Sequence, residues 1–430
     1  MDIKIFPGAL SGEIEAITSK SAAHRALICA ALCEDRTKVV IKDTSNDIES
    51  TISCLSAMGA NIIAGREENY CLIKGISHGK NEPLINCGES GSTFRFLLPA
   101  AVHLCVRAQF KGEARLPERP VSHLLGALRS GGAEFSADRL PFSVSGALKS
   151  GEYSLPGNIS SQFVSGLLFV LPLLDGDSVI TLTSTLESAA YIDMTVNMLR
   201  RFGIEIDIDV NSYKIKGNQK YKSPEVIEVE NDWSNAAFFL TAGAIGEPVA
   251  LKGLDMDSAQ GDRKIVDLLK QFGAKIEVKK DSVKISPNEL HGIDIDVCEI
   301  PDLLPVLAVA GAFARGKTTL YNAARLRLKE SDRLSSVYEM LNGLGARVEE
   351  KPDRLVITGG KKLRGGIVDS KADHRIPMSA AVCACFCGNE TLIKGAEAVN
   401  KSYPRFFEDF TGLGGTARRL ESDGDIKHGV

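Results

Sequence analysis

The chain repeats one pattern of apolar and polar positions six times. In each copy, apolar residues recur at helical spacing up to a glycine, and a short alternating apolar–polar segment follows. Glycine is typical of a helix end because it adopts a left-handed conformation at little cost. The pattern therefore predicts helix–glycine–strand units at six places: 55–62, 128–135, 199–206, 269–276, 341–348 and, more weakly, 410–417.

The spacing of these copies is nearly constant. Their glycines lie 70 to 73 residues apart, close to one-sixth of the 430-residue chain. The glycines are Gly59, Gly132, Gly203, Gly273, Gly345 and Gly415. A steady period of this size indicates a repeat architecture of six similar units.

Each copy also predicts a second helix that opens with polar residues and continues with small and aliphatic ones. The openings recur every 68 to 73 residues, at 19–21, 91–93, 160–162, 232–234, 301–302 and 373–375. Serine and aspartate are favoured N-caps, and a helix start offers free amides with a partial positive charge. One such start is ordinary capping. Six at the same place in a repeat, several beside Lys or Arg, favour an anion-binding cleft.

The order of predicted elements gives strand–helix–strand–helix–strand units, so we expect an α/β (α+β) protein with two similar domains of three units each. A chain of this length is also too long for one ordinary core. Turn-like residues at 12–13 and 222–224 are the expected crossings between the two domains.

Composition and charge narrow the class of function. The net charge is −4, from 51 basic and 55 acidic residues, which argues against a nucleic-acid or anionic-membrane partner. No secretory signal is visible at the start, and the longest apolar runs, 166–174 and 303–314, are too short to span a bilayer. We expect a cytoplasmic protein.

Ten cysteines lie mostly among aliphatic residues, as reduced core thiols do. Cys383, Cys385 and Cys387 form a C-x-C-x-C pattern, but no second group of Cys or His follows. We therefore predict no metal site.

Three basic stretches are candidates for anion binding. Lys20, Ser21 and Arg25 gather at and one turn beyond a predicted helix start. Residues 115–120 form a stiff loop that presents arginine, and residues 325–333 hold four cations and two acids. Cations and hydroxyls together suit phosphate or carboxylate groups. Each stretch alone is more typical of solvated surface charges or a surface ion-pair network than of a binding site.

Nine segments together carry a resemblance to the 5-enolpyruvylshikimate-3-phosphate synthase family, in the family's order and along almost the whole chain. They are Ser19-Lys20-Ser21 with Arg25, residues 88–95, Arg119-Pro120, and residues 160–162, 191–193, 300–302, 329–333, 373–375 and 401–404. The resemblance implies two domains, each of three βαβαββ units around buried helices, an inside-out α/β barrel. It places residues 13–224 in one domain and 1–12 with 225–430 in the other, with the active site in the cleft between them.

The resemblance also implies an activity. The family transfers the enolpyruvyl group of phosphoenolpyruvate to the 5-hydroxyl of shikimate-3-phosphate in the shikimate pathway of chorismate and aromatic amino-acid biosynthesis. It does so by addition–elimination through a tetrahedral intermediate. No metal or organic cofactor, nucleic acid or membrane takes part, and we expect a monomer.

Roles follow residue by residue from the resemblance. Asp302 matches the acid–base residue at the reacting hydroxyl, Glu330 the carboxylate at the enol carbon, and Lys20 completes the catalytic set; His374 lies beside the site. The expected shikimate-3-phosphate ligands are Lys20, Ser21, Arg25, Ser160, Ser161, Gln162, Ser188, Tyr191, Asp302, Arg325 and Lys329. The expected phosphoenolpyruvate ligands are Lys20, Gly91, Arg119, Gln162, Arg333, Arg375 and Lys401.

Two positions depart from the family pattern. Glu89 stands where many members carry asparagine, and an acid beside a phosphate site needs a partner such as Arg95 or a lysine. Arg325 replaces an asparagine at the acceptor phosphate and adds a cation. Neither change removes a residue of the acid–base set.

Two rival functions remain to be tested. UDP-N-acetylglucosamine enolpyruvyl transferase shares the fold and the donor, but it has a reactive cysteine in the loop that is 112–120 here, where no cysteine occurs. That family also lacks the Lys-Glu-Ser-Asp-Arg and Asp-His-Arg sequences. A non-catalytic anion-binding relative would have lost Asp302, Glu330 or Lys20, and all three are present.

Overall fold

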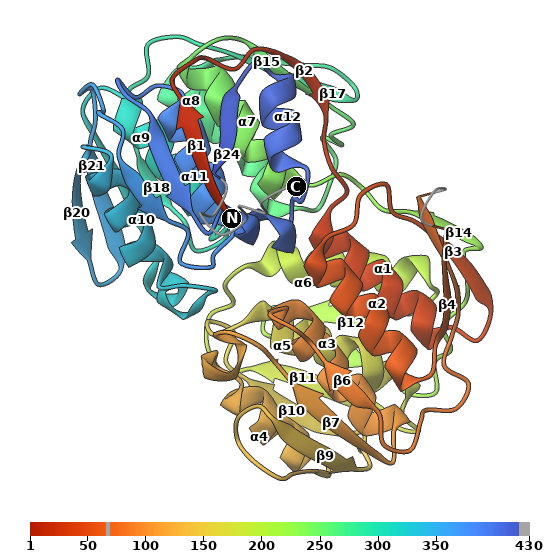
Figure 1. Ribbon diagram of the computed structural model, residues 1–430. Coiled ribbons are helices and arrows are strands. Elements are labelled where there is room, and N and C mark those ends of the chain that lie inside the picture. The colour runs from red at the N-terminus through yellow and green to blue at the C-terminus, as the bar shows by residue number, and fades with distance from the viewer. Residues whose placement is uncertain (66–68, 421–430) are drawn as a thin grey trace, which may run out of the picture. The chain divides into compact units, whose positions relative to one another are not determined.

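The computed structural model describes residues 1–65 and 69–420, which form two compact units (Figure 1). Unit 1 comprises Met1–Ile17, Asn231–Asp257 and the chain from Asp262 onward. Unit 2 comprises Thr18–Glu230 and Ser258–Gly261. The expected crossings at residues 12–13 and 222–224 lie a few residues before the boundaries between these two units. The domain bounds 13–224 and 1–12 with 225–430 stay a prediction.

Residues 12–13 were expected to form a turn, and this was wrong. They begin strand β2 (Gly12–Glu15), which pairs in parallel with β15 (Val249–Lys252). The backbone hydrogen bonds of that pairing hold this segment extended, although its sequence favours a turn.

Unit 2 contains three four-stranded sheets. Their orders are β14-β3-β5-β4, β6-β7-β9-β8 and β10-β11-β13-β12. The strands are β3 (Arg36–Val40), β4 (Asn61–Gly65), β5 (Tyr70–Lys74), β6 (Leu84–Asn86), β7 (Arg107–Lys111), β8 (Ala133–Phe135), β9 (Phe142–Gly146), β10 (Glu152–Leu155), β11 (Ser178–Leu182), β12 (Ile206–Asp209), β13 (Ser212–Ile215) and β14 (Val226–Glu228).

Unit 1 also contains three four-stranded sheets, of orders β16-β17-β15-β2, β18-β19-β21-β20 and β22-β23-β1-β24. Besides β2 and β15, the strands are β1 (Asp2–Phe6), β16 (Lys275–Val278), β17 (Ser282–Ser286), β18 (Asp294–Asp296), β19 (Lys317–Tyr321), β20 (Arg347–Lys351), β21 (Arg354–Thr358), β22 (Ile367–Asp369), β23 (Thr391–Lys394) and β24 (Thr416–Leu420).

All six sheets share one pattern. One edge strand pairs in parallel with its neighbour, as β18 does with β19. The other two pairings are antiparallel, as between β19 and β21 and between β20 and β21. Strand β1 is central in the sixth sheet, between β23 and β24, so the first residues of the chain complete the last repeat. The sixfold repeat predicted from the glycine spacing is confirmed.

Two helices follow the same order in every repeat. They are α1 (Lys20–Leu32), α2 (Asn46–Met58), α3 (Gly91–Leu104), α4 (Ser122–Ser130), α5 (Ser161–Val170), α6 (Ala189–Arg201), α7 (Trp233–Ile245), α8 (Ile265–Phe272), α9 (Leu304–Phe313), α10 (Arg333–Gly343), α11 (Arg375–Ala384) and α12 (Phe406–Gly412). Short 3-10 helices are η1 (Leu116–Glu118), η2 (Leu171–Leu173), η3 (Gly261–Lys264), η4 (Ala324–Leu328) and η5 (Ala396–Lys401).

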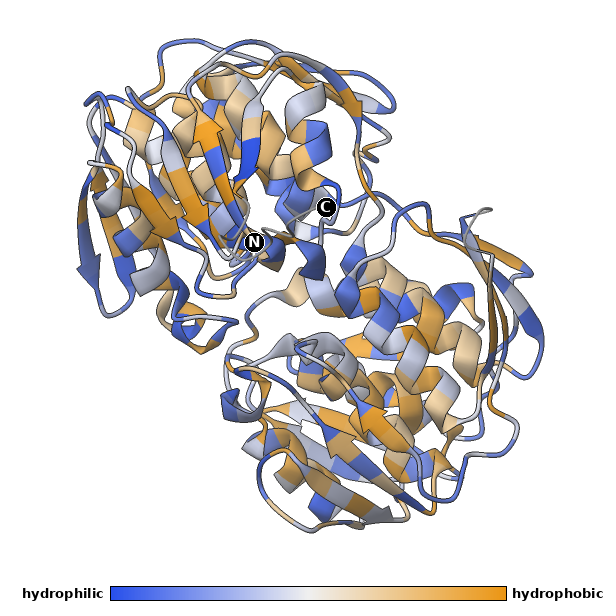
Figure 2. Ribbon diagram, in the orientation of Figure 1, coloured by the Kyte–Doolittle hydropathy of each residue, from blue (hydrophilic) through white to orange (hydrophobic). Residues whose placement is uncertain are grey.

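The first helix of each repeat lies in the interior of its unit. Helix α7 buries every residue except its last, and α11 buries all of its residues. Beyond their polar first turns, these two helices are mostly apolar or small, because the neighbouring helices and sheets surround them (Figure 2). Each unit has its own hydrophobic core, one built around α7, α9 and α11 and the other around α1, α3 and α5.

The predicted helix ends agree with the structure. Gly59, Gly132, Gly203, Gly273 and Gly345 all have positive φ between a helix and the next strand. In the sixth repeat the positive φ falls at Gly414, one residue before the glycine used for the spacing. The polar openings likewise lie at the starts of the interior helices.

The ten cysteines are free, and all except Cys298 are buried, as expected of core thiols. Within the described part of the chain, no helix combines the length and the apolar character needed to cross a membrane.

Candidate active site

Arg333 is the centre of a charged cluster in unit 1. It is the first residue of α10, where Asp332 caps the helix by accepting a hydrogen bond from the Ser335 amide. Its side chain is only 1% exposed, yet it donates to three carboxylates. Nη1 lies 2.8 Å from Asp302 Oδ1, Nη2 lies 2.6 Å from Glu330 Oε2, and Nε lies 2.9 Å from the Asp373 carboxylate.

Asp302 joins Arg333 to two further cations. Its Oδ2 accepts from Arg375 Nη2 at 2.9 Å, and its Oδ1 lies 3.7 Å from Lys329 Nζ. Burial alone would raise the pKa of Asp302, but Arg375, Lys329 and Arg333 hold this pKa well below the usual range. The side chain keeps a fifth of its surface exposed, so an ionised carboxylate is accessible here.

The cations of the cluster respond to the same surroundings in opposite ways. Burial lowers the pKa of Lys329 to about 8, which the attraction of Asp302 only partly offsets. Burial would also lower the pKa of Arg333, but Asp373, Glu330 and Asp302 raise it above the ordinary value. Arg333 is therefore permanently charged, whereas Lys329 titrates near neutral pH.

Residues on and beside α11 complete this cluster. Arg375, the first residue of α11, donates to the Ser234 hydroxyl at 3.0 Å and to Asp302. His374 is buried, with Nδ1 3.9 Å from Asp373 Oδ1. The Lys401 ammonium donates to the Ala372 carbonyl.

The segment between η4 and α10 is irregular. Lys329 does not share a helix with Arg333, because η4 ends at Leu328 and α10 begins at Arg333. The irregular residues between the two helices bring Lys329 beside Asp302 instead. Arg325, in η4, donates to the Cys298 carbonyl, near the start of the segment that carries Asp302.

Lys20 is the first candidate residue along the chain in unit 2. It is the first residue of α1, and its Nζ lies 2.8 Å from Asp47 Oδ2 on α2. Ser19 caps the helix by accepting from the Ala22 amide. An amine and a carboxylate, both largely buried, therefore lie at a helix start that favours anions.

Arg25 is held rigidly one turn further along α1. Its Nε donates to Thr195 Oγ1 at 2.8 Å, and its two terminal nitrogens donate at 2.6 Å to the carbonyls of Ser21 and Tyr191. The guanidinium also stacks 5.1 Å from the Phe96 ring centroid. Burial lowers the pKa of Arg25 to about 10, so it remains charged at neutral pH.

Gly91 and Arg119 lie in contact. A Cβ at Gly91, the first residue of α3, would lie 2.5 Å from Arg119 Nη1, so the guanidinium rests against the glycine backbone. Gln162 on α5 donates to Ser92 Oγ at 2.8 Å and accepts from Arg95 Nη1 at 2.7 Å. The starts of α3 and α5 thus lie side by side, and Arg119, which follows η1, rests against the start of α3.

The remaining predicted ligands of unit 2 lie at the starts of α5 and α6. Ser160 and Ser161 begin α5, and Ser188 precedes α6 in a left-handed conformation with φ of 58°. Tyr191 follows in the first turn of α6, where its carbonyl binds Arg25.

The partners in these clusters that were not predicted from sequence include Asp47, Ser234 and Asp373. Asp373 and Ser234 belong to helix openings that the repeat had marked, although no role followed from that. Asp47 carries no sequence signal, because only packing of α1 against α2 brings it to Lys20.

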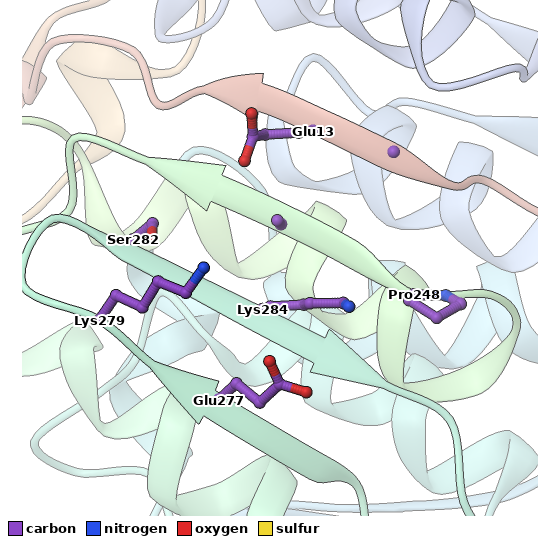
Figure 3. Close-up of a pocket in the computed structure, with 8 residues that line it drawn as sticks. Glu13, Pro248, Glu277, Lys279, Ser282 and Lys284 are labelled. Atoms are coloured by element: carbon purple, nitrogen blue, oxygen red, sulfur yellow. The ribbon is translucent and has the colours of Figure 1, made fainter.

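A separate shallow pocket lies on the sheet β16-β17-β15-β2 (Figure 3). Glu13, Glu277, Lys279 and Lys284 stand on this sheet face, and Glu13 pairs with Lys252. Charges of both signs here largely compensate each other, and no predicted site residue lines the pocket. The Arg333 and Lys20 clusters are the better candidates.

Comparison with known proteins identifies the family. The family model for EPSP synthase (3-phosphoshikimate 1-carboxyvinyltransferase) matches residues 6–410. The chain belongs to the EPSP synthase family. A 3-phosphoshikimate 1-carboxyvinyltransferase of Clostridium kluyveri is 45% identical over 419 residues, covering 96% of this chain and 97% of that protein. Its counterpart from Clostridium acetobutylicum is 44% identical with the same coverage.

Solved structures agree with this membership of the EPSP synthase family. EPSP synthase from Acinetobacter baumannii has a TM-score of 0.81 and 28% identity, over 97% of this chain and 100% of that one. The enolpyruvyl transferase NikO from Streptomyces tendae has a TM-score of 0.79 but 19% identity, so it supports the fold alone. The resemblance drawn from nine short segments is confirmed.

Among the described residues, no group of three or more His, Cys, Asp or Glu side chains has an arrangement that could hold a metal ion. The described residues include Cys383, Cys385 and Cys387.

Proposed function

We propose that this protein transfers the enolpyruvyl group of phosphoenolpyruvate to the 5-hydroxyl of shikimate-3-phosphate and releases phosphate. The observation that carries the proposal is Asp302, an ionised and accessible carboxylate held among Arg333, Arg375 and Lys329. Both substrates carry a phosphate and a carboxylate, and several cations are needed to gather so much negative charge. An ionised carboxylate among those cations is suited to take a proton from a hydroxyl group.

The addition step needs one proton acceptor and one proton donor. The 5-hydroxyl oxygen bonds to C2 of phosphoenolpyruvate, its proton goes to Asp302, and a proton arrives at C3. Glu330, fixed by Arg333, is our candidate for the proton transfer at C3. The product is a tetrahedral ketal phosphate, from which C3 loses a proton and C2 loses phosphate.

The pKa of Asp302 links binding to catalysis. With Arg375, Lys329 and Arg333 around it, the carboxylate is ionised but weakly basic. Substrate phosphate and carboxylate groups compete for the same guanidinium donors. Drawing these cations toward the substrates raises the pKa of Asp302 and so strengthens the base when the substrates are bound.

The two units contribute different groups to the proposed site. In unit 2, Lys20, Gly91, Arg119 and Gln162 supply a helix start and cations for phosphoenolpyruvate, and Lys20 neutralises the departing phosphate. Together with Lys20 and Gln162, the residues Ser21, Arg25, Ser160, Ser161, Ser188 and Tyr191 supply donors for shikimate-3-phosphate. In unit 1, Asp302, Arg325 and Lys329 are assigned to shikimate-3-phosphate, and Arg333, Arg375 and Lys401 to phosphoenolpyruvate. Because neither set contains every group required, we infer that both act on one substrate pair.

The experiment is a phosphate-release assay with each substrate alone and with both. We expect release only when phosphoenolpyruvate and shikimate-3-phosphate are both present, and none when UDP-N-acetylglucosamine replaces the shikimate compound. Release with the nucleotide sugar instead would favour the related transferase. Binding of both substrates without turnover would favour a non-catalytic relative.

A second measurement addresses the joint use of both units. Small-angle scattering should show a smaller radius of gyration with both ligands than without, because lids and domains close on substrates to exclude water. Equal compactness in the two conditions would contradict this.

We also propose that the enzyme works as a monomer in the cytoplasm. The free, buried thiols support a reducing compartment. Light scattering of the purified protein measures its oligomeric state directly.

A further inference from the structure

A chain of buried hydrogen bonds joins three helices of unit 2. His24 Nδ1 on α1 lies 2.7 Å from Thr51 Oγ1 on α2, and that oxygen lies 2.6 Å from Thr93 Oγ1 on α3. Thr93 Oγ1 donates to Ser90 Oγ at 2.7 Å. None of the four side chains is exposed to solvent, so the chain is sealed from competing water.

The hydrogen bonds of this chain are all donated in one direction, from His24 toward Ser90. Thr93 gives its hydroxyl proton to Ser90, or across 3.4 Å to the Asp47 carbonyl, and in either case away from Thr51. Thr51 must then donate to Thr93, so that Thr51 Oγ1 accepts from an Nδ1–H of His24. Burial, with Lys20 and Arg25 nearby, lowers the pKa of His24 well below the ordinary value, so the ring is neutral and carries its proton on Nδ1.

Both ends of the chain meet elements that carry proposed ligands. Ser90 caps α3 by accepting from the Thr93 amide at 3.2 Å, and Gly91, against which Arg119 rests, is the next residue. At the other end, His24 lies one turn beyond Lys20 on α1. Helix α2, which carries Thr51, also presents Asp47 to Lys20.

We propose that His24, Thr51 and Thr93 are positioning residues that hold the Ser90–Gly91 turn in fixed relation to Lys20. The inference rests on the proposed function, in which Gly91 and Lys20 bind phosphoenolpyruvate. The three residues touch no substrate and act through the first turn of α3. A buried chain of hydrogen bonds restricts the relative positions of the helices it joins, although His24 Nε2 has no hydrogen-bond partner among the described residues.

The test removes one hydroxyl without changing the side-chain shape. Thr51→Val breaks the chain at both neighbours, whereas Thr51→Ser keeps the hydroxyl. We expect Thr51→Val to raise the KM for phosphoenolpyruvate by about threefold to tenfold, the effect of one buried hydrogen bond, with kcat and the KM for shikimate-3-phosphate within about twofold of wild type. Thr51→Ser should restore the wild-type KM.

Thr241→Val is the matched control. Thr241 is an equally buried threonine within a helix, and its hydroxyl has no hydrogen-bond partner among the described residues. Its substitution should leave both KM values unchanged. A rise in the phosphoenolpyruvate KM of the same size in Thr241→Val would overturn the inference, because it would reflect a general loosening of the protein.

Amide hydrogen exchange at residues 88–93 gives a readout that does not need activity. Thr51→Val should speed exchange there, and Thr51→Ser should not; unchanged exchange together with an unchanged KM overturns the positioning role. If Thr51→Val fails to fold, His24→Leu and His24→Asn provide the same comparison, since asparagine keeps a donor near the Nδ1 position. A wild-type protein without turnover would refute the proposed function, whereas the exchange comparison would still decide the positioning role.

Discussion

Arg333 donates two hydrogen bonds to Asp373, at 2.9 and 3.3 Å, and neither side chain is appreciably exposed to solvent. Asp373 also accepts from Ser331 and from the Arg375 amide. One buried carboxylate thus orients the starts of both α10 and α11, where the two arginines of the proposed site begin their helices.

Asp373→Asn should destabilise the protein and weaken phosphoenolpyruvate binding. Loss of the Asp373 charge leaves the positive charge of Arg333 less compensated. Removing one partner of a buried ion pair costs about 3–5 kcal/mol of stability. Urea unfolding measures the stability, and steady-state kinetics measure the KM. Glu390→Gln, which removes an exposed partner of Lys4, is the control and should leave both unchanged.

Asp302→Ala should lower kcat by about 10²–10⁴, the usual contribution of a general base. Asp294→Ala removes an exposed acid from β18 in the same unit and should leave kcat unchanged. Quenched-flow measurement of the first turnover separates the chemical step from product release. A near-normal first turnover in Asp302→Ala would exclude this residue as the base.

Gly91→Ala should raise the KM for phosphoenolpyruvate with little loss of stability. The new methyl would lie 2.5 Å from Arg119 Nη1, and the flexible arginine side chain can move away, which removes a cation from the proposed site. A rise of about tenfold corresponds to about 1.4 kcal/mol, close to the lower end of the range of about 1.5–3 kcal/mol for a hydrogen bond to a charged group.

Gly126→Ala is the matched control for that substitution. Gly126 lies within α4 and has open space around its Cβ position. Alanine there should stabilise the protein by about 0.4–1 kcal/mol and leave the KM alone. An unchanged KM in Gly91→Ala would refute the assigned contact.

Lys329 should give kcat/KM for shikimate-3-phosphate an alkaline limb. Its pKa is lowered to about 8, so the side chain is charged below that pH and loses its charge as the pH rises through it. Attraction for the substrate phosphate then falls. Lys329→Arg stays charged throughout this range and should remove the limb from the pH profile. A wild-type profile that stays flat to pH 9.5 would contradict the assignment.

Features of the fold that depend on local chemistry could be predicted from the sequence. A glycine is needed wherever φ is positive after a helix, so the repeat was visible in glycine spacing alone. Ser19 and Asp232 were likewise visible as caps, because capping involves residues two or three positions apart.

Features that depend on packing between distant segments could not be predicted. Asp373 lies 40 residues after Arg333 in the chain, and Asp47 lies 27 residues after Lys20, with no periodicity to connect either pair. Residues 12–13 have turn-like composition, but their pairing with β15 makes them a strand. The roles of individual residues rest on the family resemblance and on the experiments above.

The central place of β1 in the sixth sheet bears on how the chain is synthesised. Residues 18–230 leave the ribosome as one continuous stretch and can form the three sheets of unit 2, closed by β14, before the remainder is translated. Strand β1 precedes unit 2 in the chain but pairs with β23 and β24, which are translated after all of unit 2 and most of unit 1. Its apolar residues Ile3 and Ile5 are buried in the finished unit, so the nascent chain carries an unpaired apolar strand until β23 and β24 have been translated.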